Sequence, residues 1–394
     1  MDFPHGNCQI LIDKSLAEEN IDFDFDKGKL ISKKSNLPIY GLLKAQIIPS
    51  YKYQPFFPYR FKNKIYYPYC KKCLENESQS SCKHGDSERA FIISTTVDTM
   101  NFALDNGFIE SITLLEVWSF ETASPIFRKF VSLLIQYKEN ALKNDVQAGK
   151  LIKNALQCSF GKLATKPNID KNSNCHNFRE LNEFLLRDKI KVTNITPIND
   201  KILTVTYDNQ GPWKNSCGSV ILGTTITWGG RCLLQKKLIE INEKIPNCKV
   251  LMTNTDSAVL TIPKEYNLAD KIAFSNRNGH WKHQINCKEI LSFYCLNPVC
   301  YHLSFIDENE RVSQINKIAG FKLDTLLAPK LRAEDFDHLL MTKLFNQKSN
   351  IRMLQFKKCQ NSTPQKTVFT LRNNLSKGRF LKNDIFDTLA YGFK

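Results

Sequence analysis

Four side chains within fifteen residues have the types and spacing of a metal site. Two residues separate Cys70 from Cys73, and one residue separates Cys82 from His84. Three thiols and an imidazole suit a tetrahedral zinc ion, and two short chelating pairs make the pattern more specific. The second pair is tighter than common zinc-finger spacings, so free reduced thiols are the alternative. A zinc ion with four protein ligands has no open position for chemistry, so its role would be structural.

An acidic turn between two strand-forming runs is the second group of chemical interest. Residues 250–252 and 258–262 favour strands, and the intervening Thr253–Ser257 segment predicts a β-hairpin with Asp256 at its tip. Phosphoryl transfer needs rigidly placed carboxylates that hold divalent metal ions beside phosphate oxygens. The alternative for this pentapeptide alone is a surface turn in which Asn and Asp side chains bond the backbone.

One face of a helix-forming segment carries cations, an amide and an aromatic ring. Within residues 149–162, the side chains at spacings of three and four are Lys150, Lys153, Gln157 and Phe160. Such a face can hold a triphosphate and stack against a base or a sugar. An ordinary amphipathic helix with its lysines in solvent produces the same pattern.

The charge balance favours a polyanionic partner. The chain has 55 Lys and Arg against 39 Asp and Glu, a formal net charge of +16. Residues 351–394 hold nine Lys or Arg and two Asp, a local charge of +7, which indicates a binding surface for a polyanion such as nucleic acid or a solvated basic tail. No apolar run approaches the ~20 residues that span a bilayer. Thirteen scattered cysteines without a signal peptide imply a reducing, intracellular compartment.

The surrounding sequence predicts the elements that must position these groups. Strand-prone runs at 40–48, 90–96 and 112–120 and a short helix at 98–106 indicate mixed α and β structure. Ser124 as an N-cap and Pro125 at the first helical position predict a long helix, followed by a second helix that ends before Lys166. A polar stretch continues to about residue 201, and a strand at 203–207 and a helix at 227–241 are expected after it.

Together these segments resemble family B DNA polymerases, specifically the protein-primed branch of adenoviruses, linear plasmids and Maverick-type transposons. The helix resembles the fingers motif Lys-x-x-x-Asn-Ser-x-Tyr-Gly, whose positions fall on Lys153, Gln157, Cys158, Phe160 and Gly161. The turn Asn254-Thr255-Asp256-Ser257 resembles the Asp-Thr-Asp-Ser motif. Lys317-Ile-Ala-Gly320 is similar to the palm motif that contacts the primer end, and the basic C-terminal region is similar to a thumb.

The resemblance implies an α+β fold with palm, fingers and thumb, in which helices pack on an antiparallel palm sheet. It implies DNA-directed DNA synthesis with Asp256 and Lys153 in catalysis, and with Asp256 as a Mg²⁺ ligand. Lys153, Gln157, Phe160 and Gly161 would bind the nucleotide, and Lys317 would contact DNA. The implied partners are primer–template DNA, deoxynucleoside triphosphates and a terminal priming protein. The expected location is the nucleus, and no membrane association is expected.

The same resemblance divides the chain into four parts. They are a palm-associated segment at 1–123 with a zinc loop at 70–84, a fingers hairpin at 124–166, a polar insertion and palm at 167–330, and a thumb-like region at 331–394.

Departures from the family pattern affect the expected activity. The first palm motif, an Asp followed by a Ser-Leu-Tyr-Pro-like run, would lie immediately upstream of Met1, and the chain contains no copy. Asn254 replaces one hairpin Asp, and Gln157 and Cys158 replace Asn and Ser. We therefore expect an N-terminally truncated polymerase with an incomplete palm, inactive alone. The alternatives are a non-catalytic nucleic-acid-binding relic and a zinc-dependent binding module.

Overall fold

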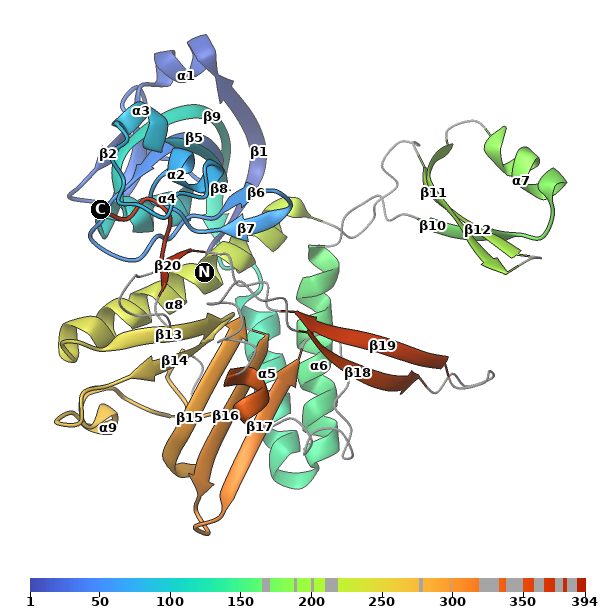
Figure 1. Ribbon diagram of the computed structural model, residues 1–394. Coiled ribbons are helices and arrows are strands. Elements are labelled where there is room, and N and C mark those ends of the chain that lie inside the picture. The colour runs from blue at the N-terminus through green and yellow to red at the C-terminus, as the bar shows by residue number, and fades with distance from the viewer. Residues whose placement is uncertain are drawn as a thin grey trace. The chain divides into compact units, whose positions relative to one another are not determined.

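The computed structural model describes residues 1–164, 171–187, 190–199, 202–209, 219–275, 279–297, 299–318, 333–337, 350–357, 365–372, 378–380 and 388–394 (Figure 1). Contacts between Cα atoms divide the chain into two units. The first unit consists of residues 1–43, 95–100 and 116–229, and the second of residues 44–94, 101–115 and 230–394. Each unit therefore combines segments that are distant in the sequence.

A four-stranded sheet with the order β1-β9-β5-β8 is built from the first 124 residues. Its strands are β1 (Phe3–Ile12), β5 (Gly41–Pro49), β8 (Phe91–Thr96) and β9 (Ile109–Ser124), and α4 (Val97–Asp105) follows β8. Alternation along β5 buries Leu43, Ala45 and Ile47. Gly41 has φ +135°, and a Cβ there would overlap the Trp118 carbonyl oxygen, so glycine is required. The strands and the short helix expected in this region are confirmed.

Shorter elements connect these strands. They are α1 (Asp13–Glu19), β2 (Ile21–Asp24), β3 (Lys29–Ser32), β4 (Leu37–Pro38), β6 (Tyr59–Phe61), β7 (Lys64–Tyr66), α2 (Lys71–Glu75) and α3 (Asp86–Arg89). Strands β2, β3 and β4 form one small sheet, and β6 and β7 form a hairpin just before the first two cysteines of the predicted zinc loop.

Two long helices lie side by side in the first unit, as expected from the helical spacing (Figure 1). They are α5 (Arg128–Asn144) and α6 (Val146–Leu163), and the Asp145 carboxylate caps α6 by accepting bonds from the Gln147 and Ala148 amides at 2.7 and 3.2 Å. The predicted helix start at Ser124 is wrong. Ser124 pairs with Phe3 across β9 and β1, and its hydroxyl bonds His5, so strand pairing delays the helix until Arg128.

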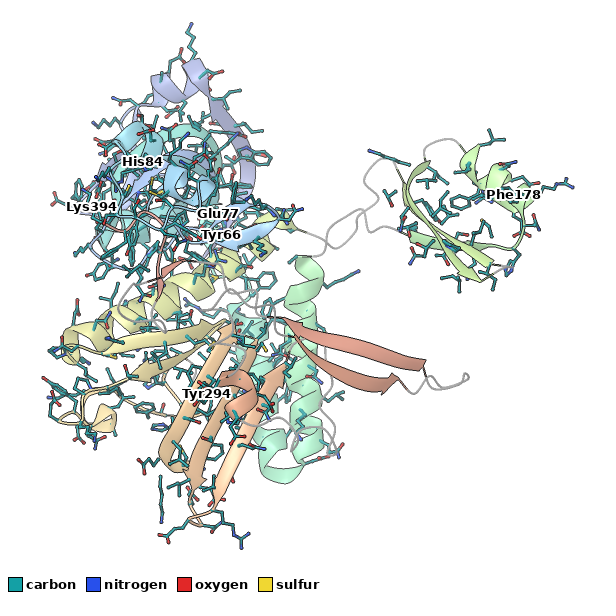
Figure 2. All side chains as sticks on the ribbon, in the orientation of Figure 1. Tyr66, Glu77, His84, Phe178, Tyr294 and Lys394 are labelled. Atoms are coloured by element: carbon teal, nitrogen blue, oxygen red, sulfur yellow. The ribbon has the colours of Figure 1, made fainter. Side chains whose placement is uncertain are left out.

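The polar stretch after α6 contains a small fold of its own. It comprises β10 (Lys171–Cys175), α7 (Phe178–Leu185), β11 (Ile190–Asn199) and β12 (Ile202–Asn209), with the sheet order β10-β12-β11. Its core consists of Cys175, Leu181, Phe184 and Val205, whereas Phe178 on α7 is exposed (Figure 2). A few well-spaced apolar residues are therefore enough to fold a segment that is polar overall. The expected end of α6 before Lys166 is confirmed, because the helix ends at Leu163. Lys166–Asn168 themselves lie outside the described residues.

Helix α8 (Val220–Lys244) precedes the acidic hairpin formed by β13 (Lys249–Asn254) and β14 (Ser257–Thr261). The later elements are α9 (Leu268–Lys271), β15 (Cys287–Asn297), β16 (Cys300–Asp307), β17 (Val312–Ile318), β18 (Asn350–Lys357), β19 (Gln365–Arg372), β20 (Arg379–Phe380) and β21 (Thr388–Leu389). Strands β15, β16 and β17 form an antiparallel sheet. Helices combined with antiparallel sheets confirm the expected α+β class.

No helix among the described residues is long and apolar enough to cross a membrane.

Candidate metal centre and acidic hairpin

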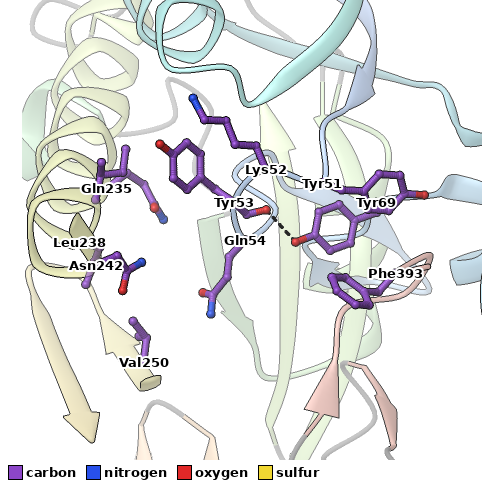
Figure 3. Close-up of a pocket in the computed structure, with 11 residues that line it drawn as sticks. Tyr51, Lys52, Tyr53, Gln54, Tyr69, Gln235, Leu238, Asn242, Val250 and Phe393 are labelled. Atoms are coloured by element: carbon purple, nitrogen blue, oxygen red, sulfur yellow. Dashed lines mark hydrogen bonds between the residues drawn. The ribbon is translucent and has the colours of Figure 1, made fainter. Parts of the chain in front are cut away.

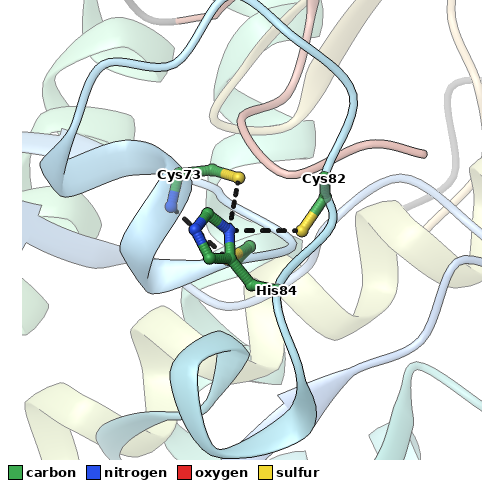
Figure 4. A group of neighbouring side chains, drawn as sticks. Cys73, Cys82 and His84 are labelled. Carbon is green, nitrogen blue, oxygen red and sulfur yellow. Dashed lines mark hydrogen bonds between the residues drawn. The ribbon is translucent and has the colours of Figure 1, made fainter.

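The four predicted zinc ligands lie together in the second unit. The ligand atoms of Cys70, Cys73, Cys82 and His84 are all within 4.8 Å of one another. Figure 4 shows the Cys73, Cys82 and His84 side chains pointing toward one another from α2 and the loop that follows it. We call residues 70–84 the Cys/His loop. Its geometry brings together all four of the residues that the sequence pattern selected.

The distances within this group match those of a tetrahedral zinc site. The Nδ1 atom of His84 lies 3.6, 3.2 and 3.7 Å from the sulfur atoms of Cys70, Cys73 and Cys82. A tetrahedron with Zn–S bonds of about 2.3 Å and Zn–N bonds of about 2.0 Å separates sulfur from nitrogen by about 3.5 Å. The three sulfur–nitrogen distances are therefore compatible with a zinc ion bound by these four side chains.

The local environment raises the pKa of two of the three thiols and lowers the pKa of the third. Burial raises the pKa of the Cys70 and Cys73 thiols, because it disfavours the thiolate. Burial also opposes ionisation of Cys82, but hydrogen bonds from the His84 backbone and ring and from the other two thiols outweigh it and lower the pKa to about 7. One ligand is thus ready to ionise near neutral pH, and a bound cation would favour the thiolate form of the other two.

A buried arginine fixes the loop to the sheet region of the same unit. Arg89 is 3% exposed, and its guanidinium donates to Glu110 at 2.9 Å, to Asp86 at 3.3 Å and to the Pro49 carbonyl at 2.7 Å. The preceding carbonyl of Glu88 lies 3.9 Å from the Cys70 sulfur. Because Arg89 bonds groups on both sides of the loop, it holds the second half of the Cys/His loop against β5 and β9.

The acidic hairpin presents Asp256 at the tip of a two-residue turn, as predicted. Asn254 pairs with Ser257 across the hairpin, and Ser257 Oγ donates to the Asn254 carbonyl at 2.9 Å. Thr255 adopts φ +58°, a left-handed conformation that is uncommon for a β-branched residue. Backbone strain of this kind concentrates at functional sites. Asp256 itself is exposed at the tip.

Packing on two sides fixes the hairpin within the second unit. Leu260 and Ile262 pack against Ile241 and Ile245, which lie at the end of α8 and just after it. On strand β13, the Met252 sulfur lies 3.6 Å from the sulfur of Cys295 on β15. The hairpin thus has little freedom to change direction, which is the property that a metal-binding carboxylate needs.

The described residues do not by themselves complete a magnesium site at this tip. Among the described residues, a group of three or more Cys, His, Asp or Glu side chains that could share a metal ion occurs in the Cys/His loop. Asp256 belongs to no such group of described residues, and the side chains that precede it in the turn, Asn254 and Thr255, are neutral. Mg²⁺ prefers near-octahedral oxygen coordination and gives up its waters reluctantly, so this donor set does not fit the two-ion site that the resemblance implies.

The predicted nucleotide face lies on α6 of the first unit. Lys153, Gln157 and Gly161 are exposed, and Phe160 is half-buried with its ring 6.3 Å from that of Phe127. The partly buried stripe of this helix is Ile152, Leu156 and Phe160, whereas Leu151 is 71% exposed. The lysine and the amide are therefore accessible to a ligand, while the ring is held in place.

Lys317 is exposed on β17, opposite Tyr301 of β16. The remainder of its motif, Ala319 and Gly320, lies outside the described residues, as do most of residues 331–387. Asp256 and Lys317 belong to the second unit, whereas the α6 face belongs to the first.

An aromatic group that no sequence pattern predicted adjoins the Cys/His loop. Tyr51 and Tyr69 stack at 5.0 Å, and together with Phe393 they line one side of a cavity of about 290 Å³ (Figure 3). Val250 and the end of α8 line the other side. No local sequence signal could reveal this group, because its members come from widely separated parts of the chain.

Comparison with known proteins gives two matches. A sequence profile described as DNA polymerase type B, organellar and viral, matches residues 2–210 of the 394, which include the Cys/His loop and α6 but not Asp256 or Lys317. Among solved structures, the chain is similar to a phi29 DNA polymerase complexed with primer–template DNA in a post-translocation binary complex, with a TM-score of 0.52 and 11% identity. That alignment covers 94% of this chain and 54% of the other, so the chain spans about half the length of that polymerase. No curated protein sequence matches the chain.

Proposed function

We propose a role in DNA-directed DNA synthesis for this chain, because it belongs to the DNA polymerase type B family of organelles and viruses. The single observation that carries the proposal is the rigid hairpin that presents Asp256 at a strained two-residue turn. Nucleotidyl transfer depends on positioning the substrates and on neutralising phosphate charge with metal ions. A carboxylate held in a fixed position can bind such an ion. Primer–template DNA and deoxynucleoside triphosphates are the substrates of this activity.

Within the family, we assign the chain to the protein-primed branch that includes Maverick-type, adenovirus and linear-plasmid polymerases. The order of the α6 face, the acidic hairpin and Lys317 along the chain supports this assignment. A terminal priming protein is then an additional partner, and Mg²⁺ is the catalytic ion. Asp256 belongs to no group of three or more metal ligands among the described residues, and we propose that another Mg²⁺ ligand comes from a further palm segment.

The α6 face is assigned to the incoming nucleotide. In a helix with 100° per residue, Gln157 and Phe160 lie within about 40° of Lys153, so a triphosphate and a sugar or base can be bound together. We expect Lys153→Ala to weaken binding of a fluorescent deoxynucleoside triphosphate by about tenfold, since a hydrogen bond to a charged group contributes about 1.5–3 kcal/mol. Fluorescence anisotropy with Mg²⁺ present measures the effect.

Lys162 is the matched control for that experiment. It lies nine residues further along the same helix, about 180° around the axis from Lys153, and it is also exposed. Lys162→Ala removes the same charge and should leave nucleotide affinity within about twofold, because only general electrostatics change. Equal losses in the two variants would mean that α6 attracts the nucleotide through net charge and has no binding face.

A non-catalytic nucleic-acid-binding relic is the second candidate function. The lone carboxylate at the hairpin favours it, and the net charge of +16 serves it equally well. Activity of a completed active site distinguishes the two functions, whereas DNA binding is common to both.

DNA binding should depend strongly on salt and weakly on sequence. Each phosphate that a cation neutralises adds about 0.9 to the slope of log affinity against log salt. Replacing Lys357, Lys366 and Arg372 with Gln in the basic C-terminal region should reduce the slope by up to about 3. Affinity for a primer–template duplex across a salt series gives the slopes directly.

The control removes three lysines whose ammonium groups already face carboxylates. Lys27, Lys33 and Lys34 lie 3.1, 2.7 and 3.6 Å from the carboxylates of Asp24, Asp22 and Glu19. Their replacement with Gln lowers the net charge equally but should leave the slope nearly unchanged. If the control variant loses as much slope as the C-terminal variant, the basic C-terminal region is not the contact surface.

We assign a structural zinc ion to the Cys/His loop. The donor set of three thiols and one imidazole and the near-tetrahedral spacing of their atoms support it. Helix α2 has only five residues, and half of the buried core cluster around it consists of the three cysteines of the loop. A zinc ion would thus add to hydrophobic burial as a local source of stability.

A further inference from the structure

We infer that the Cys/His loop is the docking surface for the last residues of the sequence, Tyr391–Lys394, and that zinc in the loop keeps this segment docked. We call Tyr391–Lys394 the tail. The inference rests on the zinc site proposed above. In addition to stabilising the loop, the zinc site would then hold in place a segment more than three hundred residues away in the sequence.

Backbone hydrogen bonds join the tail to the loop and to its flanks. The amide of Tyr69, directly before the first cysteine, donates to the Tyr391 carbonyl at 2.8 Å. The amide of the ligand Cys82 donates to the Phe393 carbonyl at 3.3 Å. The Tyr51 hydroxyl donates to the Gly392 carbonyl at 3.0 Å. Three successive carbonyls of the tail are thus bonded, so its path is specified residue by residue.

Aromatic contacts cover the tail on either side of its glycine. Tyr391 is 3% exposed and shares a core cluster with Tyr66, Leu74 and the three cysteines of the loop. The Phe393 ring lies 5.6 Å from that of Tyr69, and the Lys394 ammonium lies 5.0 Å from the Tyr51 ring. Figure 2 labels Lys394 in the same part of the molecule as His84 and Tyr66.

The tail approaches a zinc ligand so closely that only glycine fits. Gly392 has φ +88°, and a Cβ at this position would overlap both the Cβ and the backbone of Cys70. A side chain there would be strained by its conformation and by the clash at once. The docked path of the tail is therefore tied to the position of Cys70 itself.

The composition of the shared cluster makes docking depend on metal. Three of the six buried members of the cluster are the cysteines of the loop, and Tyr391 is the member that the tail contributes. Zinc would fix the three sulfur atoms at about 3.8 Å from one another. Without it, nothing covalent or ionic holds them together, and the surface that receives Tyr391 and Gly392 loses its shape.

Docking also fixes one end of the basic C-terminal region. Strand β21, Thr388–Leu389, ends one residue before the tail and pairs with Arg379–Phe380 of β20. Residues 351–394 carry a local charge of +7 and are the proposed DNA contact. Zinc loss would therefore release the end of the DNA-binding segment as well as loosen the loop.

The test measures release of the tail in the full chain. Chymotrypsin cleaves after Tyr391 and Phe393, and intact mass reports the loss of residues 392–394. With zinc bound, cleavage should be slow. After chelation it should be at least about tenfold faster, because proteolysis follows the population of the open form. Hydrogen exchange at the Tyr69 and Cys82 amides should accelerate in parallel, since both lose their acceptors in the tail.

Gly392→Ala distinguishes release of the tail from loss of the metal. This variant leaves all four ligands in place, so it should retain one zinc per molecule yet release the tail as fast as the chelated protein. Gly230→Ala is the control, because a Cβ there meets open space. It should behave as the unmodified chain does.

The outcomes distinguish this inference from the zinc proposal. Zinc near one per molecule with equal cleavage rates before and after chelation would overturn the docking inference and leave the zinc site intact. Slow cleavage in zinc-loaded Gly392→Ala would also overturn it. Zinc near zero in zinc-supplemented protein would overturn both.

Discussion

Primer extension by the 394-residue chain with Mg²⁺ is expected to be undetectable. Nucleotidyl transfer with two metal ions would require carboxylates from two places on the palm to hold the ions. Asp256 is the one carboxylate in the turn Asn254–Ser257, and it belongs to no group of three or more metal ligands among the described residues. A single monodentate carboxylate should leave Mg²⁺ mostly hydrated. Restoring the second hairpin carboxylate with Asn254→Asp should not produce activity, since both groups then come from the same turn.

Supplying the other ligand should restore extension. We propose fusing to the N-terminus a palm segment that carries the Asp-x-x-Ser-Leu-Tyr-Pro run, and comparing four proteins in one assay. These are the chain, its Asn254→Asp variant, the fusion and the fusion with Asp256→Ala. The fusion should extend a primer, and Asp256→Ala should reduce its rate by about a thousandfold or more, as expected when roughly 4 kcal/mol of transition-state stabilisation is lost. Extension by the unmodified chain that survives Asp256→Ala would place the active site elsewhere.

Zinc binding is the second large effect that we expect. Protein prepared without chelator should contain about one zinc per molecule, and Cys73→Ser should release it, because a neutral hydroxyl is a poor zinc ligand. Structural zinc sites in finger peptides have apparent binding free energies of about 10–16 kcal/mol, so the loop should lose most of its stability. Elemental analysis and thermal unfolding measure the two consequences.

Cys300→Ser is the control for that variant. Cys300 is buried like Cys73, but it lies on β16 and is not among the four clustered ligands. The replacement places a hydroxyl in a buried site and should cost about 1–3 kcal/mol without changing the zinc content. A zinc content near zero in the unmodified protein, or equal stability losses in the two variants, would contradict a metal centre in the Cys/His loop.

Local sequence patterns determined most of the secondary structure of this protein. Helices α5, α6 and α8 and the hairpin β13–β14 follow from spacings of 3.6 and 2 residues, which act over neighbouring positions. The four loop ligands were identified for a similar reason. They are close in sequence, so a short loop is enough to bring them together. The family match and the similarity to a solved polymerase fold confirm the α+β polymerase class, while the four-part division of the chain and the nucleotide and DNA contacts stay predictions.

Long-range pairing decided the rest. Strand pairing of Ser124 with Phe3 moved the start of α5 to Arg128, although Ser124 and Pro125 favour a helix locally. A core of four residues folds the segment from Lys171 to Asn209, which is polar overall. The docking of Tyr391 and Gly392 against Cys70 joins positions more than three hundred residues apart, and no local pattern encodes such a contact. The sequence alone determined which side chains could bind a metal or a phosphate, because this depends on residue type and on spacing along the chain. Tertiary structure decided which of them meet, because burial and close packing depend on parts of the chain that are distant from one another.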